Sequence, residues 1–112
     1  MNRRRFFLVT ATAVISARNA GAEEDARISL RVAGGKLMGG PRVIRLKRNA
    51  AVVLTVLSDT PDELHVHGYN LELKLLPNQA TTLSFVAKHT GRFTFELHEA
   101  HTELGAFEIY PE

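Results

Sequence analysis

The stretch that decides the fold is residues 62–97, DELHVHGYNLELKLLPNQATTLSFVAKHTGRFTFEL. It contains four runs in which apolar and polar side chains alternate, namely residues 63–68, 71–75, 81–87 and 92–98. An alternation with a period of two is the pattern of a strand that turns one face toward a core. Residues 77–79 (PNQ) and 90–91 (TG), which separate these runs, are typical of turns. We therefore expect four short strands in this stretch.

The chain on either side continues the same pattern. Four further runs are expected as strands, namely residues 27–33, 42–47, 51–57 and 104–110. The run 51–57 (AVVLTVL) is almost wholly apolar and β-branched, which predicts a strand buried on both faces. The glycines of residues 34–35 and 39–40 are expected in turns. No run of ten or more residues has the apolar period of a helix, so we predict an all-β sandwich or barrel of seven to eight strands.

The composition fits one globular domain without covalent cross-links. The chain has 112 residues, of which 45% are hydrophobic and 23% are charged, and these proportions are ordinary for a single folded domain. It contains no cysteine, which excludes disulfides, thiolate nucleophiles and any copper site that needs a thiolate. The core must then provide the stability, and we expect its aromatic part to consist of Phe85, Phe93, Phe95 and Phe107.

The first 22 residues have the features of an export signal. Three arginines at residues 3–5 precede an uncharged apolar run over residues 6–17, and residues 20–22 (AGA) form a small-x-small cleavage site. The apolar run is shorter than the roughly 20 residues that a membrane-spanning helix needs. We predict a signal peptide over 1–22 and a mature periplasmic domain over 23–112, with no membrane span after cleavage. The arginines resemble a twin-arginine signal; the general secretory route and an uncleaved N-terminal helix or anchor are the alternatives.

The positive charge of the chain belongs to this N-terminal segment. The whole sequence has 14 basic and 12 acidic residues, a formal net charge of +2. Residues 1–22 hold four arginines and no acid, so residues 23–112 keep 10 basic against 12 acidic residues, a net charge of −2. A slightly acidic domain argues against nucleic acid as a partner. The remaining basic cluster is expected on an exposed sheet edge, where charge prevents edge-to-edge pairing; it comprises Arg42, Arg45, Lys47 and Arg48.

Four of the five histidines form two close pairs. His65 and His67 alternate on one expected strand, so their imidazoles share a face of the sheet. His98 and His101 lie close together in a short loop. Imidazole groups are common ligands of copper, zinc and nickel, so these four histidines are the predicted metal ligands. The alternative is that they are surface or loop histidines without a metal, as we expect for His89, which lies in a turn.

Other candidate chemistry is sparse. The carboxylates of Asp59, Asp62 and Glu63 flank the loop before the histidine strand and are expected to be solvated, as loop carboxylates usually are. Ser58 and Ser84 have no basic partner nearby in the sequence, so no hydrolase site can be recognised. We therefore predict that the protein is not an enzyme.

Three segments together resemble the cupredoxin-like superfamily: residues 62–69 (DELHVHGY), 77–87 (PNQATTLSFVA) and 90–97 (TGRFTFEL). The copper subunit of cytochrome oxidase and small periplasmic cupredoxin-like proteins share this layout. It leads from a histidine-bearing strand through a T-x-L-x-F strand to a G-x-F strand and then into a ligand loop. The resemblance extends over residues 62–110, about half of the chain, and implies a Greek-key β-sandwich.

On this resemblance, His65 lies at the position of the family's first copper-ligand histidine and Leu97 at that of its cysteine ligand. Blue-copper and dinuclear copper sites need a thiolate, so both are excluded. Rapid electron transfer of the cupredoxin kind is not supported either. The resemblance implies that the loop of residues 98–105 approaches His65 at one end of the sandwich. The candidate donors of this loop are His98, His101 and either Glu99 or Glu103.

Two functions remain open from the sequence. The first is an exported cupredoxin-like protein that binds a transition metal through histidines for metal handling rather than electron transfer, with copper favoured and zinc as the alternative. The second is a metal-free β-sandwich module that docks a periplasmic or inner-membrane partner protein. A third, weaker interpretation is a small copper-dependent oxidase, although the sequence indicates no substrate pocket.

Overall fold

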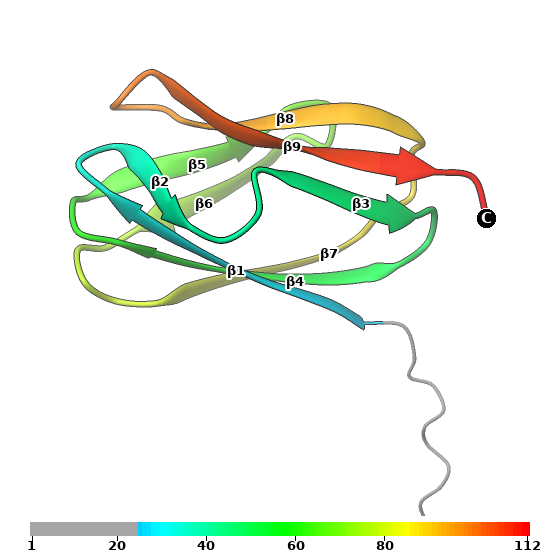
Figure 1. Ribbon diagram of the computed structural model, residues 1–112, viewed down its shortest axis with the longest axis horizontal. Coiled ribbons are helices and arrows are strands. Elements are labelled where there is room, and N and C mark those ends of the chain that lie inside the picture. Colours follow the sequence, from blue (N-terminus) through cyan, green and yellow to red (C-terminus); the bar gives the residue numbers. More distant parts are fainter. Residues whose placement is uncertain (1–24) are drawn as a thin grey trace, which may run out of the picture.

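Two β-sheets face each other across one hydrophobic core in the computed structural model, which describes residues 25–112 (Figure 1). The signal predicted over residues 1–22 lies outside the described residues. The four-stranded sheet has the order β2-β1-β4-β7, with β1 (Asp25–Ala33), β2 (Lys36–Gly39), β4 (Ala51–Ser58) and β7 (Thr81–Val86). The five-stranded sheet has the order β3-β9-β8-β5-β6, with β3 (Val43–Lys47), β5 (Asp62–Val66), β6 (Leu71–Leu75), β8 (Gly91–Leu97) and β9 (Thr102–Tyr110).

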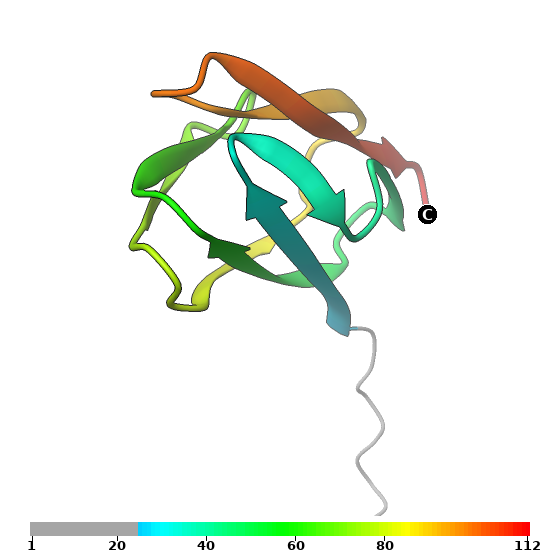
Figure 2. The same cartoon turned by 60° about the vertical axis from the view of Figure 1, so that its left-hand side comes forward.

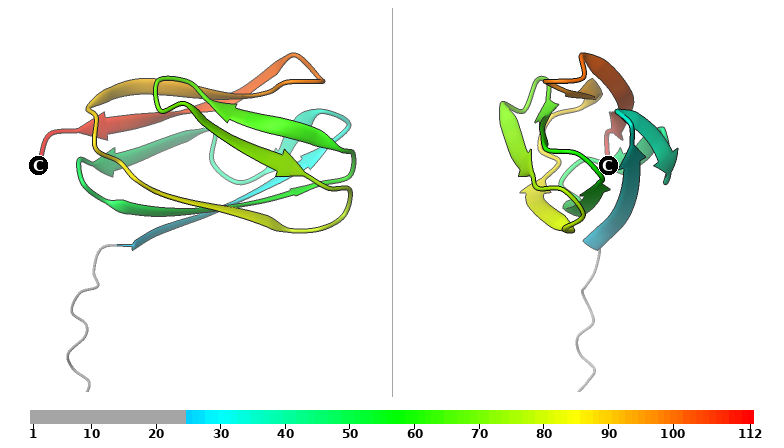
Figure 3. Two further views of the ribbon diagram at one scale, coloured as in Figure 1. Left: turned by 180° about the vertical axis from the view of Figure 1, so that it is seen from behind. Right: turned by 90° about the vertical axis from the view of Figure 1, so that its left-hand side faces the viewer.

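The chain passes repeatedly from one sheet to the other, so neighbours in space are often distant in sequence. β1 pairs with β4 and β3 pairs with β9, both in parallel, whereas β5, β6, β8 and β9 pair antiparallel. The right-hand panel of Figure 3, which looks along the length of the molecule, shows the strands of the two sheets arranged around a common interior. These crossovers are those of a Greek-key sandwich, as predicted. Within residues 25–112, the structure has no helix long and apolar enough to cross a membrane.

The core lies between the two sheets and is built from alternate residues of nearly every strand. Phe95 and Phe107 are fully buried, and their rings lie 5.2 Å apart between centroids. Phe85 packs edge-on against Phe107 at 5.5 Å, while Phe93 is partly buried at the margin of the core. The four predicted aromatic residues therefore all contribute to the core, as their alternation indicated.

The structure has nine strands rather than seven to eight, because a hairpin stands where the sequence predicted only turns. Gly34 and Gly35 both have a positive φ, 59° and 74°, and link β1 to the added strand β2 in a tight turn. Figure 2 shows this hairpin, coloured blue to cyan, at one edge of the four-stranded sheet. Since β2 has only four residues, its alternation is too short to be recognised between glycines.

The prediction that residues 51–57 are buried on both faces was wrong. In β4 the burial alternates, with Val52, Leu54 and Val56 in the core and the residues between them at least partly accessible. Leu57 is 38% exposed on the outer face. No layer of the described structure covers this face. β4 therefore has more apolar side chains than its one buried face needs.

The basic cluster lies on a sheet edge, as predicted. β3 is the outermost strand of the five-stranded sheet, and its Arg45 and Lys47 side chains are exposed. Arg45 also forms an ion pair with Glu108 of the neighbouring β9, with Nε and Oε1 3.2 Å apart. Charged side chains on this strand make pairing with another sheet edge unfavourable.

Candidate metal centre

The outer face of the five-stranded sheet carries the strongest candidate site. On β5, Leu64 and Val66 are buried in the core, so His65 between them points to the outer face. β5 lies between β6 and β8, and the register places Glu72 of β6 and Glu96 of β8 directly opposite His65. A carboxylate residue therefore flanks the histidine on each neighbouring strand.

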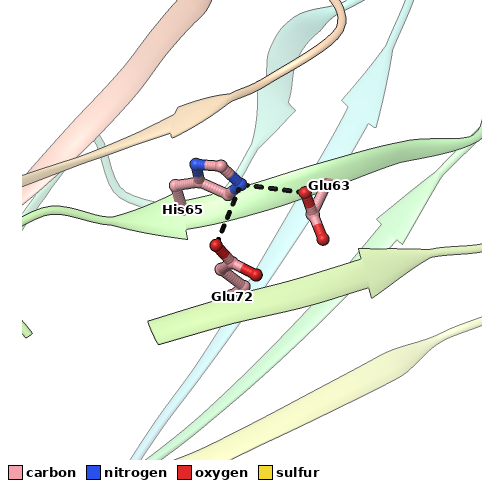
Figure 4. Close-up of side chains that lie close together, drawn as sticks. All are labelled: Glu63, His65 and Glu72. Atoms are coloured by element: carbon pink, nitrogen blue, oxygen red, sulfur yellow. Dashed lines mark hydrogen bonds and ion pairs between the residues drawn. The ribbon is translucent and has the colours of Figure 1, made fainter. Parts of the chain in front are cut away.

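Three side chains on this face converge, and we call Glu63, His65 and Glu72 the His65 cluster (Figure 4). The Nε2 atom of His65 lies 2.9 Å from Oε1 of Glu63 and 3.8 Å from Oε2 of Glu72. One donor atom from each of the three residues lies within 4.8 Å of the others. The His65 side chain is 24% exposed, so the cluster is accessible to an ion from solvent while its imidazole is held by the sheet.

The carboxylates on this outer face of the sheet favour the protonated, positively charged form of His65. The hydrogen bond to Glu63 raises the pKa of His65 above its ordinary value of 6.5, and the charges of Glu72, Glu63 and Glu96 act in the same direction. Partial burial opposes this rise. The same arrangement would attract a metal cation, which must compete with the proton for the imidazole because only neutral histidine binds metals.

The turn between β8 and β9 brings a second histidine to the His65 cluster. His98 directly follows β8, and its backbone N–H donates to the carbonyl oxygen of Glu63 at 2.9 Å. Its ring stacks on that of His65, with centroids 5.1 Å apart and planes inclined by 23°. The ring of His101 lies further along this turn, 6.4 Å from that of His98 between centroids. The backbone of His101 has a φ of 53°, the left-handed conformation that a tight turn requires.

The two remaining histidines, His67 and His89, have partners outside the His65 cluster. His67 shares the outer face with His65, but its Nε2 lies 3.3 Å from Oε2 of Glu96. It lines a shallow surface hollow with His65 and Glu72, next to the β5–β6 turn. His89 lies beside Tyr69, whose hydroxyl donates to the His89 carbonyl and accepts from its N–H. Of the four predicted ligands, the structure thus stacks His65 and His98, sets His101 beside His98, and pairs His67 with Glu96.

The expectation that the Asp62 carboxylate is solvated was wrong, because this carboxylate is buried and hydrogen-bonded. The residue is only 9% exposed and occupies an inward position of β5. Its Oδ1 accepts hydrogen bonds from the backbone N–H groups of Glu63 at 2.7 Å and Glu99 at 2.8 Å. Its Oδ2 accepts from the N–H of Ala100 at 3.2 Å. Asp62 therefore ties the β8–β9 turn to the strand that carries His65. The alternation along β5, which places Asp62 on the same face as Leu64, is the sequence pattern that could have predicted its burial.

The position of the expected cysteine ligand faces away from this site. Leu97 is 1% exposed, and it pairs with Leu64 in the register of β5 and β8. Both leucines belong to the core, whereas His65 lies on the outer face of the same sheet. His65 and Leu97, which stand at the family's histidine and cysteine ligand positions, therefore do not point to a common site in this fold. The candidate site is an outer-face site rather than one inside the end of the sandwich.

The fold is cupredoxin-like, as comparison with solved structures shows. The chain is similar to a copper-binding protein solved by NMR in its apo form, with 15% identity over 80% of this chain and 91% of that chain and a TM-score of 0.65. It is also similar to the periplasmic domain of subunit II of cytochrome oxidase from Bradyrhizobium japonicum, with 12% identity over 80% and 87% of the two chains and a TM-score of 0.63.

A third similar structure is an oxidised amicyanin mutant, with 18% identity over 73% of this chain and 80% of that chain and a TM-score of 0.52. No protein-family model and no curated protein sequence matches the chain. At such low identities the likeness defines the fold, while the function must be argued from the site.

Proposed function

We propose that this protein is an exported cupredoxin-like protein that binds a copper ion through histidines and carries it as cargo rather than transferring electrons. The observation that carries the proposal is the His65 cluster with His98 stacked against it. Imidazole and carboxylate donors in one place suit Cu(II), which takes nitrogen and oxygen ligands. The chain has no cysteine, so the thiolate on which blue-copper electron transfer depends is missing.

The distances from His65 to its two carboxylate partners are compatible with a single ion. Two ligand atoms about 2.1 Å from the same ion lie at most about 4.2 Å apart. The distances from Nε2 of His65 to the carboxylates of Glu63 and Glu72, 2.9 and 3.8 Å, fall within this limit. The copper site of the proposal comprises these three residues, with His98 as a fourth ligand once its ring, which stacks on that of His65 at 5.1 Å between centroids, turns toward the ion. We propose as further donors for loading or unloading the ion His67, which lines the same surface hollow as His65, and His101, whose ring lies 6.4 Å from that of His98.

A periplasmic location accords with the proposal. The signal-like sequence of residues 1–22 supports export, and one of the similar structures is a periplasmic oxidase domain. An accessible site on a small exported domain suits transfer of the ion to an acceptor protein. We propose a periplasmic or inner-membrane protein as that acceptor.

Titration of the metal-free protein with Cu(II) by calorimetry tests the proposal. We expect one saturable site in the wild type, and a loss of affinity of at least about tenfold, or about 1.4 kcal/mol, in both His65→Ala and His98→Ala. His89→Ala is the matched control, because His89 is an exposed histidine with its own partner, Tyr69. Absence of saturable binding, or equal binding by all four proteins, would overturn the proposal.

A metal-free docking module is the second candidate. It is favoured by three large exposed apolar side chains on the four-stranded sheet: Met38 at 55%, Val86 at 45% and Leu57 at 38% exposure. The melting temperature distinguishes the candidates, because a ligand that binds only the native state raises apparent stability by mass action. A melting temperature that stays constant on addition of Cu(II) would favour the docking module.

A further inference from the structure

We infer that the proposed copper site discriminates between oxidation states: it holds Cu(II) and releases the ion after one-electron reduction to Cu(I). This inference rests on the proposed function and specifies how its cargo would be unloaded. Three features of the described residues carry it: nitrogen and oxygen donor atoms without sulfur, the stacked arrangement of the two imidazoles, and the carboxylates that surround them.

The donor atoms of the site are nitrogen and oxygen. Cu(I) is selected by soft thiolate and thioether ligands, whereas imidazole and carboxylate suit divalent ions. The sequence has no cysteine and two methionines. Met38 belongs to β2 in the four-stranded sheet, whereas the His65 cluster lies on the other sheet, and Met1 lies outside the described residues. A reduced ion would find no sulfur donor among the described residues of this face.

The arrangement of the two imidazoles is also unfavourable for Cu(I). A two-coordinate Cu(I) ion takes its two donors from opposite sides. The rings of His65 and His98 instead stack, with centroids 5.1 Å apart and planes only 23° from parallel. The N–H of His98 and the carbonyl of Glu63 hold the turn in this position, as do the two hydrogen bonds from the turn to Asp62. A linear N–Cu–N arrangement places its two rings end to end, so it would require this stack to separate.

The surrounding charge favours the dication over the monocation. Glu63 precedes His65 by two residues on β5, and Glu72 and Glu96 lie opposite it on the two neighbouring strands. Lys74, opposite Glu63 on β6, offsets part of this charge. Because Coulomb attraction scales with the charge of the ion, reduction of Cu(II) to Cu(I) halves the attraction to these carboxylates.

The electron for the release step comes from an external one-electron reductant of the ene-diol or quinol class. The donor gives one electron to the bound Cu(II), loses one proton to solvent, and becomes a radical. The copper–carboxylate and copper–imidazole bonds break as the Cu(I) ion leaves, and no atom of the protein changes its oxidation state. The protein returns to the metal-free form and can bind another Cu(II) ion.

Paired competition titrations on the purified full chain test the inference. Cu(II) affinity is measured against a nitrilotriacetate competitor, and Cu(I) affinity is measured without oxygen against bicinchoninate. We expect Cu(II) to bind at least about 100-fold more tightly than Cu(I), which at 59 mV per tenfold lowers the copper reduction potential by about 120 mV relative to the aqueous couple. Ascorbate should then abolish the electron paramagnetic resonance signal and pass the copper to bicinchoninate.

The outcomes separate this inference from the proposed function. Equal affinities, or tighter binding of Cu(I), would overturn the inference and leave copper binding in place. Failure to bind Cu(II) at all would overturn both. Retention of the copper by the protein after full reduction, with bicinchoninate in excess, would also overturn the inference.

A sulfur substitution provides the second test. Glu72→Met places a thioether at an exposed position of the His65 cluster without touching the core. We expect this variant to gain at least about tenfold in Cu(I) affinity, because a soft ligand is what the site lacks. Ser84→Met is the matched control, since Ser84 is exposed on β7 of the other sheet. Equal Cu(I) binding by Glu72→Met and the wild type would argue that soft donors are not what limits the site.

Discussion

His98 stacks on His65 because Asp62, three residues before His65, accepts two backbone hydrogen bonds from the turn that His98 begins. The two histidines come from β5 and from the β8–β9 turn, and no contact between their rings could be expected from sequence distance alone. The buried carboxylate of Asp62 thus fixes the geometry of a surface site through the backbone. We regard it as a positioning residue rather than a ligand.

Removal of the Asp62 carboxylate should weaken both the fold and the site. We expect Asp62→Ala to lower the free energy of unfolding by about 2–4 kcal/mol, since it leaves three backbone N–H groups without their charged acceptor. Urea denaturation measures the loss. Asp59→Ala is the control, because its exposed carboxylate accepts only from the N–H of Gly34 among the described contacts, and should cost less than about 1 kcal/mol. Equal losses in the two variants would contradict the role of Asp62.

The raised pKa of His65 should appear in an NMR titration of the metal-free protein. We expect the His65 ring protons to titrate above the ordinary value of 6.5, and Glu63→Gln to lower this pKa because the hydrogen bond to Glu63 is its main cause. A pKa raised in the folded state stabilises the fold fully below 6.5, and this contribution disappears as the pH rises through the folded pKa.

The urea midpoint of the wild type should therefore fall over that pH interval more than the midpoint of Glu63→Gln. Copper binding should show the opposite trend, since protons compete for the imidazole and weaken Cu(II) affinity as the pH falls below the folded pKa of His65. An identical titration of His65 in the wild type and in Glu63→Gln would contradict this account.

A cysteine at position 97 should not create a blue-copper site. Leu97 faces the core and His65 faces outward, so the sulfur of Leu97→Cys cannot share an ion with the His65 ring. We expect no intense thiolate-to-copper absorption when this variant is titrated with Cu(II). Glu63→Cys is the matched variant, since it places a thiolate next to the His65 ring, and it should develop such absorption. The reverse result would show that the ligands converge inside the sandwich.

Gly105 on β9 should tolerate no side chain. A Cβ at this position would overlap the carbonyl oxygen of Arg42 and approach Cζ of Phe95 to 2.9 Å. We expect Gly105→Ala to destabilise the fold by about 3 kcal/mol, because both neighbours are held by the core and the sheet. Gly34→Ala is the control: its Cβ meets open space, and its φ of 59° alone should cost about 1 kcal/mol. Thermal unfolding of the two variants measures the difference.

Much of the fold could be read from local alternation. All eight predicted runs are strands in the structure. A period of two in side-chain polarity indicates which face of a strand packs against the core. β2 was not predicted, because its four residues are too few to show a clear alternation of apolar and polar side chains. The burial of β4 was overestimated because apolar composition does not reveal whether a second layer covers the strand.

The candidate site could be predicted only in part. The phase of β5 placed His65 and His67 on one face of the sheet, and the resemblance to cupredoxin-like proteins directed attention to the loop that contains His98. The carboxylates of Glu63 and Glu72 were not expected beside the imidazole of His65. The position of Glu72 depends on the register between β5 and β6, which local sequence does not specify.

The sequence by itself determined that the chain is all-β and that any copper site must lack a thiolate, because alternation and composition are local properties. Only the tertiary structure decided that His65 faces outward among carboxylates while Leu97 faces the core. It also decided that Asp62 anchors the turn carrying His98. These relationships depend on strand register and on crossovers between two sheets, and so on contacts that form only when distant segments pack together.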